Sequence, residues 1–150
     1  KLFVVSTTDQ VYVIDEPTEQ IEKVYNLKGA KGAISIAYAP EEKLLFVVSQ
    51  GTDNLQILDA TDGKLKADVK VGAGPLAVVW EPVRKLAYVA NRGSDSVAVV
   101  DVNGNLVANL PGGSYANHVF TDGKGTVWSV NKARGLNDPQ GDHISRYAAK

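Results

Sequence analysis

Short apolar segments alternate with polar turns along the whole chain. The clearest stretch contains four segments of strand character, at residues 44–49, 54–59, 64–71 and 76–80. They are rich in valine, isoleucine, leucine and aromatic residues, which fit the pleated surface of a sheet. Turn sequences such as Asp62-Gly63 separate the segments and supply the positive φ angles that tight hairpins need. No segment keeps a helical period, so the pattern predicts an all-β protein.

The strand pattern repeats at a nearly constant interval. An apolar segment that starts at Lys1 recurs from Lys43 and from Lys85, 42 residues apart each time, and a weaker copy starts 41 residues later at Thr126. Regular self-similarity of this kind arises when each copy forms the same structural unit. Two further landmarks recur in step with it: the strand ends at Asp15, Asp59 and Asp101, and the segments 37–40, 79–82 and 119–122.

Four antiparallel strands in every ~40–45 residues are typical of a β-propeller. A β-sandwich, the competing all-β fold, has no reason to repeat at a fixed period. The sequence therefore predicts a β-propeller of about 3.5 four-stranded antiparallel blades. One partial propeller domain would occupy residues 1–150, with repeats at about 1–42, 43–84 and 85–125 and a partial repeat at 126–150.

The predicted strands can be labelled A to D from the axis of the propeller outward. The chain then contains B-C-D, A-B-C-D, A-B-C-D and A-B-C, which makes fourteen strands. The first unit lacks its inner strand and the last lacks its outer strand, so both ends would carry unpaired edges. Two copies of this chain could not fill these gaps, because neither supplies the required D-to-A junction. We therefore expect the N-terminal half of the same propeller as a partner.

The composition is that of a folded globular protein, with 44% apolar and 22% charged residues. A formal net charge of -1 provides no overall attraction to nucleic acid or to an anionic membrane. No apolar run approaches the ~20 residues that cross a bilayer, so we expect no membrane insertion. Cysteine is absent, which excludes disulfides, thiolate nucleophiles and zinc-thiolate sites.

The third repeat carries a family motif. Tyr88-Val89-Ala90-Asn91, followed by residues 93–101, resembles the repeat of the YVTN β-propeller family, and the register of the whole chain resembles the C-terminal half of YncE-like proteins. The resemblance implies a seven-bladed ring, of which fourteen strands would be half, and a periplasmic location. It also implies a binding protein, and weak DNA binding has been attributed to YncE-like members. The signature departs to Phe-Val-Val-Ser in the second repeat and Trp-Ser-Val-Asn in the fourth, which affects only the packing of that strand.

Catalytic motifs are missing from the sequence. It contains no nucleophile elbow, no zinc-binding His-Glu-x-x-His and no phosphate-binding loop, so we predict no catalytic residue, metal ligand or cofactor. His118 is interpreted as a partly buried histidine, bonded to a neighbouring backbone group near the mouth of the central channel, and His143 as a surface histidine. The recurring Asp15, Asp59 and Asp101 are expected to accept backbone N–H bonds in the following turn rather than to bind calcium.

The loops divide between the two ends of the strands. The B–C and D–A loops share the end at which propellers usually bind ligands, and five basic residues there balance five acidic ones. Two of these loops are unusual: residues 111–117 place a tyrosine beside amides, and residues 132–142 form a loop about six residues longer than its counterparts. Segment 137–142 is oxygen-rich but lacks calcium-binding spacing, which favours a solvated loop. The candidate ligand-binding residues are Arg92, Tyr115, Asn117, His118, Lys132 and Arg134.

These features favour a non-enzymatic scaffold, periplasmic or secreted, that binds a polar small molecule, peptide or protein at the B–C/D–A end. One alternative is an enzyme or redox module whose cofactor is held in the central channel together with the missing blades. The other is a weak binder of single-stranded DNA. Such binding needs aromatic side chains along a basic groove, and the candidate site offers a single tyrosine.

Overall fold

The computed structural model describes residues 1–148, which form fourteen β-strands and no helix. The strands belong to four antiparallel sheets. The first blade contains β1 (Leu2–Ser6), β2 (Gln10–Asp15) and β3 (Gln20–Asn26), and the second contains β4 (Ala33–Ala39), β5 (Leu44–Ser49), β6 (Asn54–Asp59) and β7 (Leu65–Lys70). The third contains β8 (Pro75–Glu81), β9 (Leu86–Asn91), β10 (Ser96–Asp101) and β11 (Leu106–Pro111), and the fourth contains β12 (Ala116–Thr121), β13 (Thr126–Asn131) and β14 (Ile144–Ala148).

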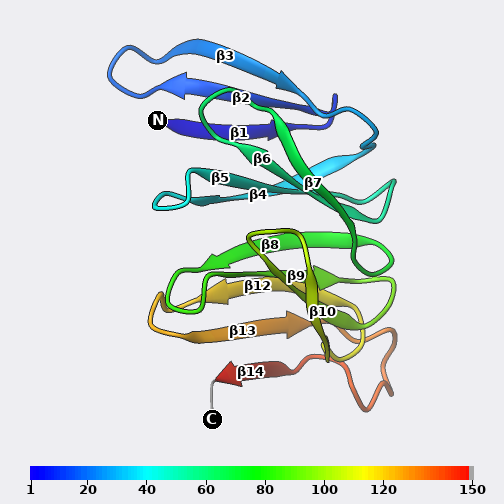
Figure 1. Cartoon of the computed structure of the whole chain (residues 1–150). Coiled ribbons are helices and arrows are strands. Elements are labelled where there is room, and N and C mark those ends of the chain that lie inside the picture. The colour runs from blue at the N-terminus through cyan, green and yellow to red at the C-terminus, as the bar shows by residue number, and fades with distance from the viewer. Residues whose placement is uncertain (149–150) are drawn as a thin grey trace.

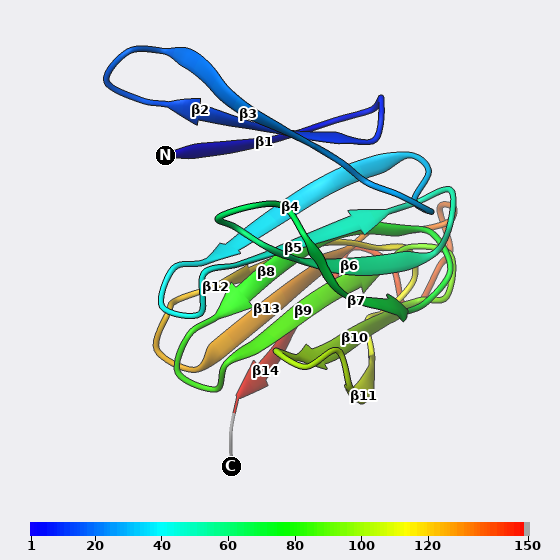
Figure 2. The same cartoon turned by 45° about the horizontal axis from the view of Figure 1, so that its top comes forward.

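The four sheets lie one above another in chain order, and each strand pairs with its neighbour in the sequence (Figure 1). The first strands of the complete blades, β4 and β8, contact each other and β8 also contacts β12, so these are the inner strands. The view in Figure 2 shows the resulting stack of twisted sheets, with β7 and β11 at outer edges. The predicted fold class, with its B-C-D, A-B-C-D, A-B-C-D and A-B-C units, is confirmed.

Apolar clusters fill each of the three interfaces between successive blades. All six residues of β5 are buried, because the second blade has a neighbour on both faces. Exposed and half-buried positions alternate in β14 and over the first four residues of β1, because one face of each end blade has no neighbouring sheet. Blade stacking, rather than any single sheet, therefore forms the core.

Aromatic rings link successive blades at equivalent positions. Phe3 in β1 packs on Tyr38 in β4 with ring centroids 4.9 Å apart. Phe46 in β5 stacks on Trp80 in β8 at 5.1 Å and an interplanar angle of 16°. In both pairs a B-strand ring meets an A-strand ring of the next blade. Trp128 in β13 occupies the corresponding B-strand position of the fourth blade.

In the structure, residues 119–122 are shifted by one position relative to the sequence alignment, which matched Phe120 with Trp80. Phe120 lies opposite Trp128 in the β12–β13 ladder, at the level that Val79 occupies in the third blade, and not at the level of Trp80. Because successive strand residues point to opposite faces, this shift turns Phe120 to the open face of the fourth blade. Its side chain is 46% exposed there.

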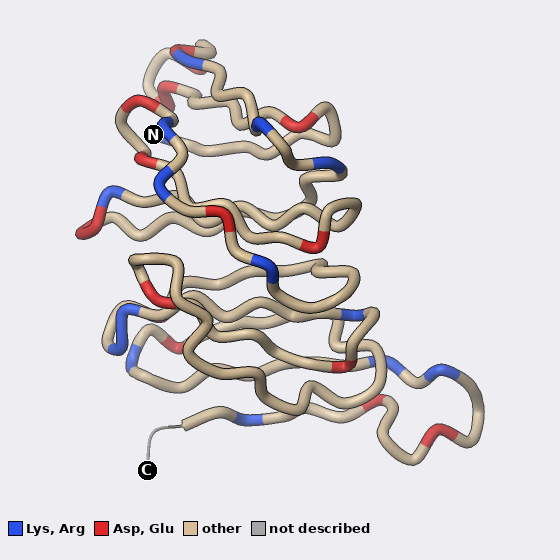
Figure 3. Tube along the Cα trace, turned by 45° about the vertical axis from the view of Figure 1, so that its right-hand side comes forward, with Lys and Arg blue, Asp and Glu red and all other residues tan. Residues whose placement is uncertain are grey.

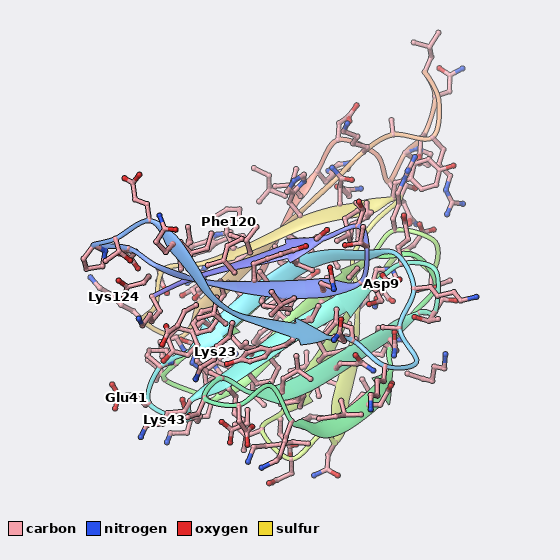
Figure 4. The ribbon with its side chains drawn as sticks, turned by 90° about the horizontal axis from the view of Figure 1, so that it is seen from above. Asp9, Lys23, Glu41, Lys43, Phe120 and Lys124 are labelled. Carbon is pink, nitrogen blue, oxygen red and sulfur yellow. The ribbon has the colours of Figure 1, made fainter. Side chains whose placement is uncertain are left out.

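The loops separate into two ends, as the sequence predicts. Figure 4 shows Asp9, in a B–C loop, at one end of the strands, and Glu41, Lys43 and Lys124, in A–B loops, at the other. The candidate ligand-binding residues in loops therefore belong to the end that carries Asp9.

Candidate functional site

One aspartate in each of the first three B–C loops ties that loop to the D–A loop beside it. Asp9, Asp53 and Asp95 each precede strand C and adopt positive φ angles of 60°, 52° and 54°. Their backbone carbonyls accept an N–H from the end of strand D. Their carboxylates accept the N–H groups of Ala33, Gly74 and Tyr115 at 3.0, 2.8 and 2.9 Å. This aspartate clamp recurs at each junction between blades.

Tyr115 occupies a position where the two preceding junctions have glycine. The N–H of the first residue after strand B donates to the carbonyl of Gly32 in the first junction and of Gly74 in the second. In the third junction it is shared between the carbonyls of Ser114 at 3.1 Å and Tyr115 at 3.3 Å. The φ angles of Gly32, Gly74 and Tyr115 are 68°, 60° and 51°. A left-handed conformation costs nothing for glycine but about 1–2 kcal/mol for a residue with a side chain. Residues held in this way are concentrated at functional sites.

Two arginines from different blades lie over the Tyr115 ring. The guanidinium carbon of Arg92, in the B–C loop of the third blade, is 4.7 Å from the ring centroid. That of Arg134, in the long loop of the fourth blade, is 4.9 Å away. Each cation–π contact at an exposed position contributes about 0.5–1 kcal/mol. We call these three residues the Arg–Tyr–Arg cluster.

Asp95 connects the aspartate clamp to this cluster. One carboxylate oxygen accepts the Tyr115 N–H, and the other binds Nη2 of Arg134 at 2.5 Å. Arg92 and Lys132 are exposed and form no ion pair with any residue from 1 to 148. The backbone of Lys132 lies beside the cluster, because its N–H donates to the carbonyls of Ser114 and Tyr115 at 3.1 and 3.3 Å.

The long loop of the fourth blade projects beyond the neighbouring loops and carries both signs of charge (Figure 3). Buried Asn131 anchors it, donating to the Gln140 carbonyl and accepting the His143 N–H at 2.8 Å. The Asp138 carboxylate accepts the N–H groups of Arg134 and Gln140 at 2.9 and 3.0 Å. These backbone bonds lower the pKa of Asp138. The loop that presents Arg134 is therefore internally bonded.

Asn117 and His118 lie apart from the Arg–Tyr–Arg cluster, on the inner strand β12. They line a pocket of about 370 Å³ whose other walls come from the inner strands β4 and β8. The Asn117 amide nitrogen is 2.9 Å from Nδ1 of His118. The residues level with His118 in the other two inner strands are Ser35 and Ala77. The six candidate residues thus divide into a loop group of four and an inner-strand group of two.

The prediction of a partly buried His118 is wrong for this chain. Its side chain is exposed, because no further blade faces the inner strand β12 on that side, and its described partner is a side chain rather than the backbone. His143 is exposed on the long loop, as predicted. Among residues 1–148, no three His, Asp or Glu side chains are arranged to hold a metal ion. A membrane-spanning helix is absent from the same residues.

An aspartate ends strand C in each of the first three blades, and in two of the three cases its carboxylate accepts backbone N–H groups of the following turn. Asp59 and Asp101 accept backbone N–H bonds of 2.8 to 2.9 Å from the next residues, which confirms that expectation for both. The Asp15 carboxylate instead binds the Lys1 ammonium and the Thr18 hydroxyl. Strand C therefore ends in aspartate in all three blades, but the carboxylate partners differ. They include backbone N–H groups for Asp59 and Asp101, and the side chains of Lys1 and Thr18 for Asp15.

Asp95 is the site residue that the sequence analysis missed. From the sequence it counts only as one of the negative charges that balance the loop end. Its recurrence in step with Asp9 and Asp53 is the signal that could have identified the aspartate clamp, since equivalent residues in a repeat make equivalent contacts.

No protein-family model and no curated protein sequence matches this chain. Its structure is similar to a chain of the hydrazine synthase of Kuenenia stuttgartiensis, with a TM-score of 0.81 and 19% sequence identity. The similarity covers 89% of this chain but only 39% of that chain. At this identity the likeness shows the fold alone, and it agrees with the propeller blades described above.

Proposed function

We propose that this chain is part of a non-enzymatic propeller scaffold that binds a polar ligand at its B–C/D–A loop end. The observation that carries the proposal is Tyr115, a strained aromatic residue in place of glycine, with Arg92 and Arg134 over its ring. Tyrosine and arginine are the residues on which binding energy is most often concentrated. Rigid aromatic side chains also lose little entropy when a ligand binds.

The N-terminal half of the same propeller is the partner that we propose for the two end blades, in a protein exported to the periplasm. The exposed apolar faces of the first and fourth blades support this, as does the YVTN-like motif of the third blade. With that half added, the fourteen strands of this chain would be half of a seven-bladed ring. The name of the similar enzyme lends no support to catalysis here, because the likeness extends to the fold only.

The substitution Tyr115→Gly tests the proposed site, because it installs the residue of the other two junctions. We expect the free energy of unfolding to change by less than about 1 kcal/mol, since relief of the left-handed strain offsets the lost cation–π contacts. NMR titrations of the protein with small sugars, carboxylic acids, phosphates and short peptides should shift the amides of Arg92, Tyr115 and Arg134. These shifts should vanish in the folded variant.

Ligands that bind the wild type and the Tyr115→Gly protein equally would contradict the proposal. So would shifts confined to the inner-strand pocket of Asn117 and His118. A short single-stranded oligonucleotide belongs in the same series, because affinity that falls steeply with salt would instead favour a nucleic-acid binder.

A further inference from the structure

We propose that the Arg–Tyr–Arg cluster binds an oxyanion, a carboxylate or phosphate group, through Arg92, and that Asp95 acts as an internal anion that competes for Arg134. This inference rests on the proposed function and specifies its ligand class. The two arginines face one ring at nearly equal distances, 4.7 and 4.9 Å, but only Arg134 is paired with a carboxylate. Arg92 presents the same guanidinium group to the ring, but no carboxylate among residues 1–148 forms an ion pair with it.

Guanidinium groups recognise carboxylate and phosphate through a planar set of N–H donors. Packing of Arg92 and Arg134 against Tyr115 limits the positions that these long side chains sample. Less entropy is then lost when an anion binds, which is the basis of affinity from preorganisation. Two hydrogen bonds fix the Tyr115 backbone that carries this ring: its N–H donates to the Asp95 carboxylate, and its carbonyl accepts the Lys132 N–H.

The nearby acidic side chains are engaged by the fold. Asp95 and Asp138 accept backbone N–H groups as described, and Asp142 accepts the N–H of Ala133 at 3.2 Å. Backbone donors partly compensate the charge of these carboxylates. Arg92 and Lys132 have no ion-pair partner within residues 1–148. An incoming anion at the cluster therefore meets one unpaired arginine beside one paired arginine.

The preceding junction shows that the aspartate clamp does not require arginines. Asp53 there holds Gly74 in the way that Asp95 holds Tyr115, and it forms no ion pair with the described residues. The position of Arg92 is taken by Gln50, whose N–H makes the equivalent bond to the D–A loop. Arginine and tyrosine are thus additions to a junction that closes without them, which points to a ligand.

Two substitutions with opposite expected effects test the inference. Arg92→Gln copies the preceding junction and should weaken binding of inorganic phosphate and of acetate about tenfold, because it removes the unpaired guanidinium. Asp95→Asn keeps an amide oxygen for the Tyr115 N–H and tolerates positive φ, but it removes the competing charge. We expect it to tighten binding about three- to tenfold. Affinities would be measured by NMR titration at constant ionic strength, since surface electrostatics are screened by salt.

Asp9→Asn is the matched control, because it neutralises the clamp of the first junction, whose D–A loop bonds to Gln50 and not to an arginine. It should leave both affinities within about twofold of the wild type. Tight binding of phosphate alone would assign the site to phosphate groups, and comparable binding of acetate would assign it to carboxylates. An Asp95→Asn protein that is folded and binds either anion no better than wild type would overturn the inference. If neutral sugars or peptides shift the cluster amides and both anions leave them unchanged, the oxyanion inference fails while the proposed function stands.

Discussion

Glu81 shows how much one residue can contribute to the junction between blades. It is fully buried at the end of β8, and its carboxylate accepts the N–H groups of Val83, Arg84 and Gly125 at 3.2, 2.8 and 3.0 Å. Gly125 belongs to the fourth blade, so the carboxylate joins two A–B loops. The Arg84 guanidinium strengthens the same connection, because it donates to the Gly125 carbonyl and to the Tyr88 hydroxyl.

Glu81→Gln should lower the free energy of unfolding by about 1–3 kcal/mol, because the amide nitrogen cannot accept and leaves at least one part-buried N–H without a partner. Urea denaturation would measure the change. Glu41→Gln, in the exposed A–B loop of the second blade, is the control and should stay within about 0.5 kcal/mol of the wild type. Equal stability of Glu81→Gln and the control would show that this carboxylate does not hold the loops.

At the scale of elements, the turns between strands C and D are stabilised by charge. The Asp101 carboxylate accepts the Asn105 side-chain amide at 2.8 Å and the N–H groups of Asn103 and Asn105. The Asn105 side-chain bond and these backbone bonds lower the pKa of Asp101. Asp59 has a lowered pKa in the preceding repeat, through the Thr61 N–H and Lys66. In both hairpins the folded state therefore favours the ionised carboxylate, which stabilises the turn.

A lowered pKa in the folded state makes this contribution depend on pH. It is present above the ordinary carboxyl pKa of about 4 and is lost as the pH falls through the lower value of the folded protein. We expect Asp101→Asn to be less stable than the wild type at pH ~7, and the difference to shrink toward zero as the pH falls from ~5 to ~2. Urea unfolding across that range would measure it. A difference that stays constant with pH would contradict the assignment.

At the scale of the whole molecule, the two end blades have open apolar faces. Leu2 and Ile21 of the first blade are 51% and 60% exposed, and Phe120 and Ile144 of the fourth are 46% and 67% exposed. The equivalent faces of the second and third blades are covered by neighbours. Trp128 stacks on Phe120 at 5.2 Å, within its own blade, where the corresponding Phe46 stacks on the next one. Such faces favour association.

The double substitution Phe120→Ser and Ile144→Ser should reduce self-association of the 16.0 kDa chain, because it removes exposed apolar area from one end face. Sedimentation velocity at several concentrations would measure the mass. Val83→Ser is the control, since Val83 is 66% exposed but lies in an A–B loop away from the end faces. A wild-type chain that is monomeric at ~100 µM and melts cooperatively would contradict both this prediction and the proposed partner half.

The order and extent of the strands followed from the sequence because pairing in this fold is local. Each strand pairs with its neighbour through a short turn, so alternation and turn residues carry the information. The predicted strands at 44–49 and 54–59 coincide with β5 and β6, and the neighbouring ones differ at their ends by one residue. Segment 119–122 was misaligned because the turn between β12 and β13 is one residue shorter than its counterpart: the paired residues Trp80 and Ala87 are seven positions apart, whereas Thr121 and Val127 are six apart.

Local pattern thus determined the propeller, its units and the end of the strands at which each loop lies. Blade stacking alone decided which side chains meet. It buried Glu81, and it brought Arg92 and Arg134 to Tyr115 from two different blades. It also separated Asn117 and His118 from that cluster. These contacts depend on the twist and spacing of successive sheets, which arise from the packed core as a whole and leave no periodic trace in the chain.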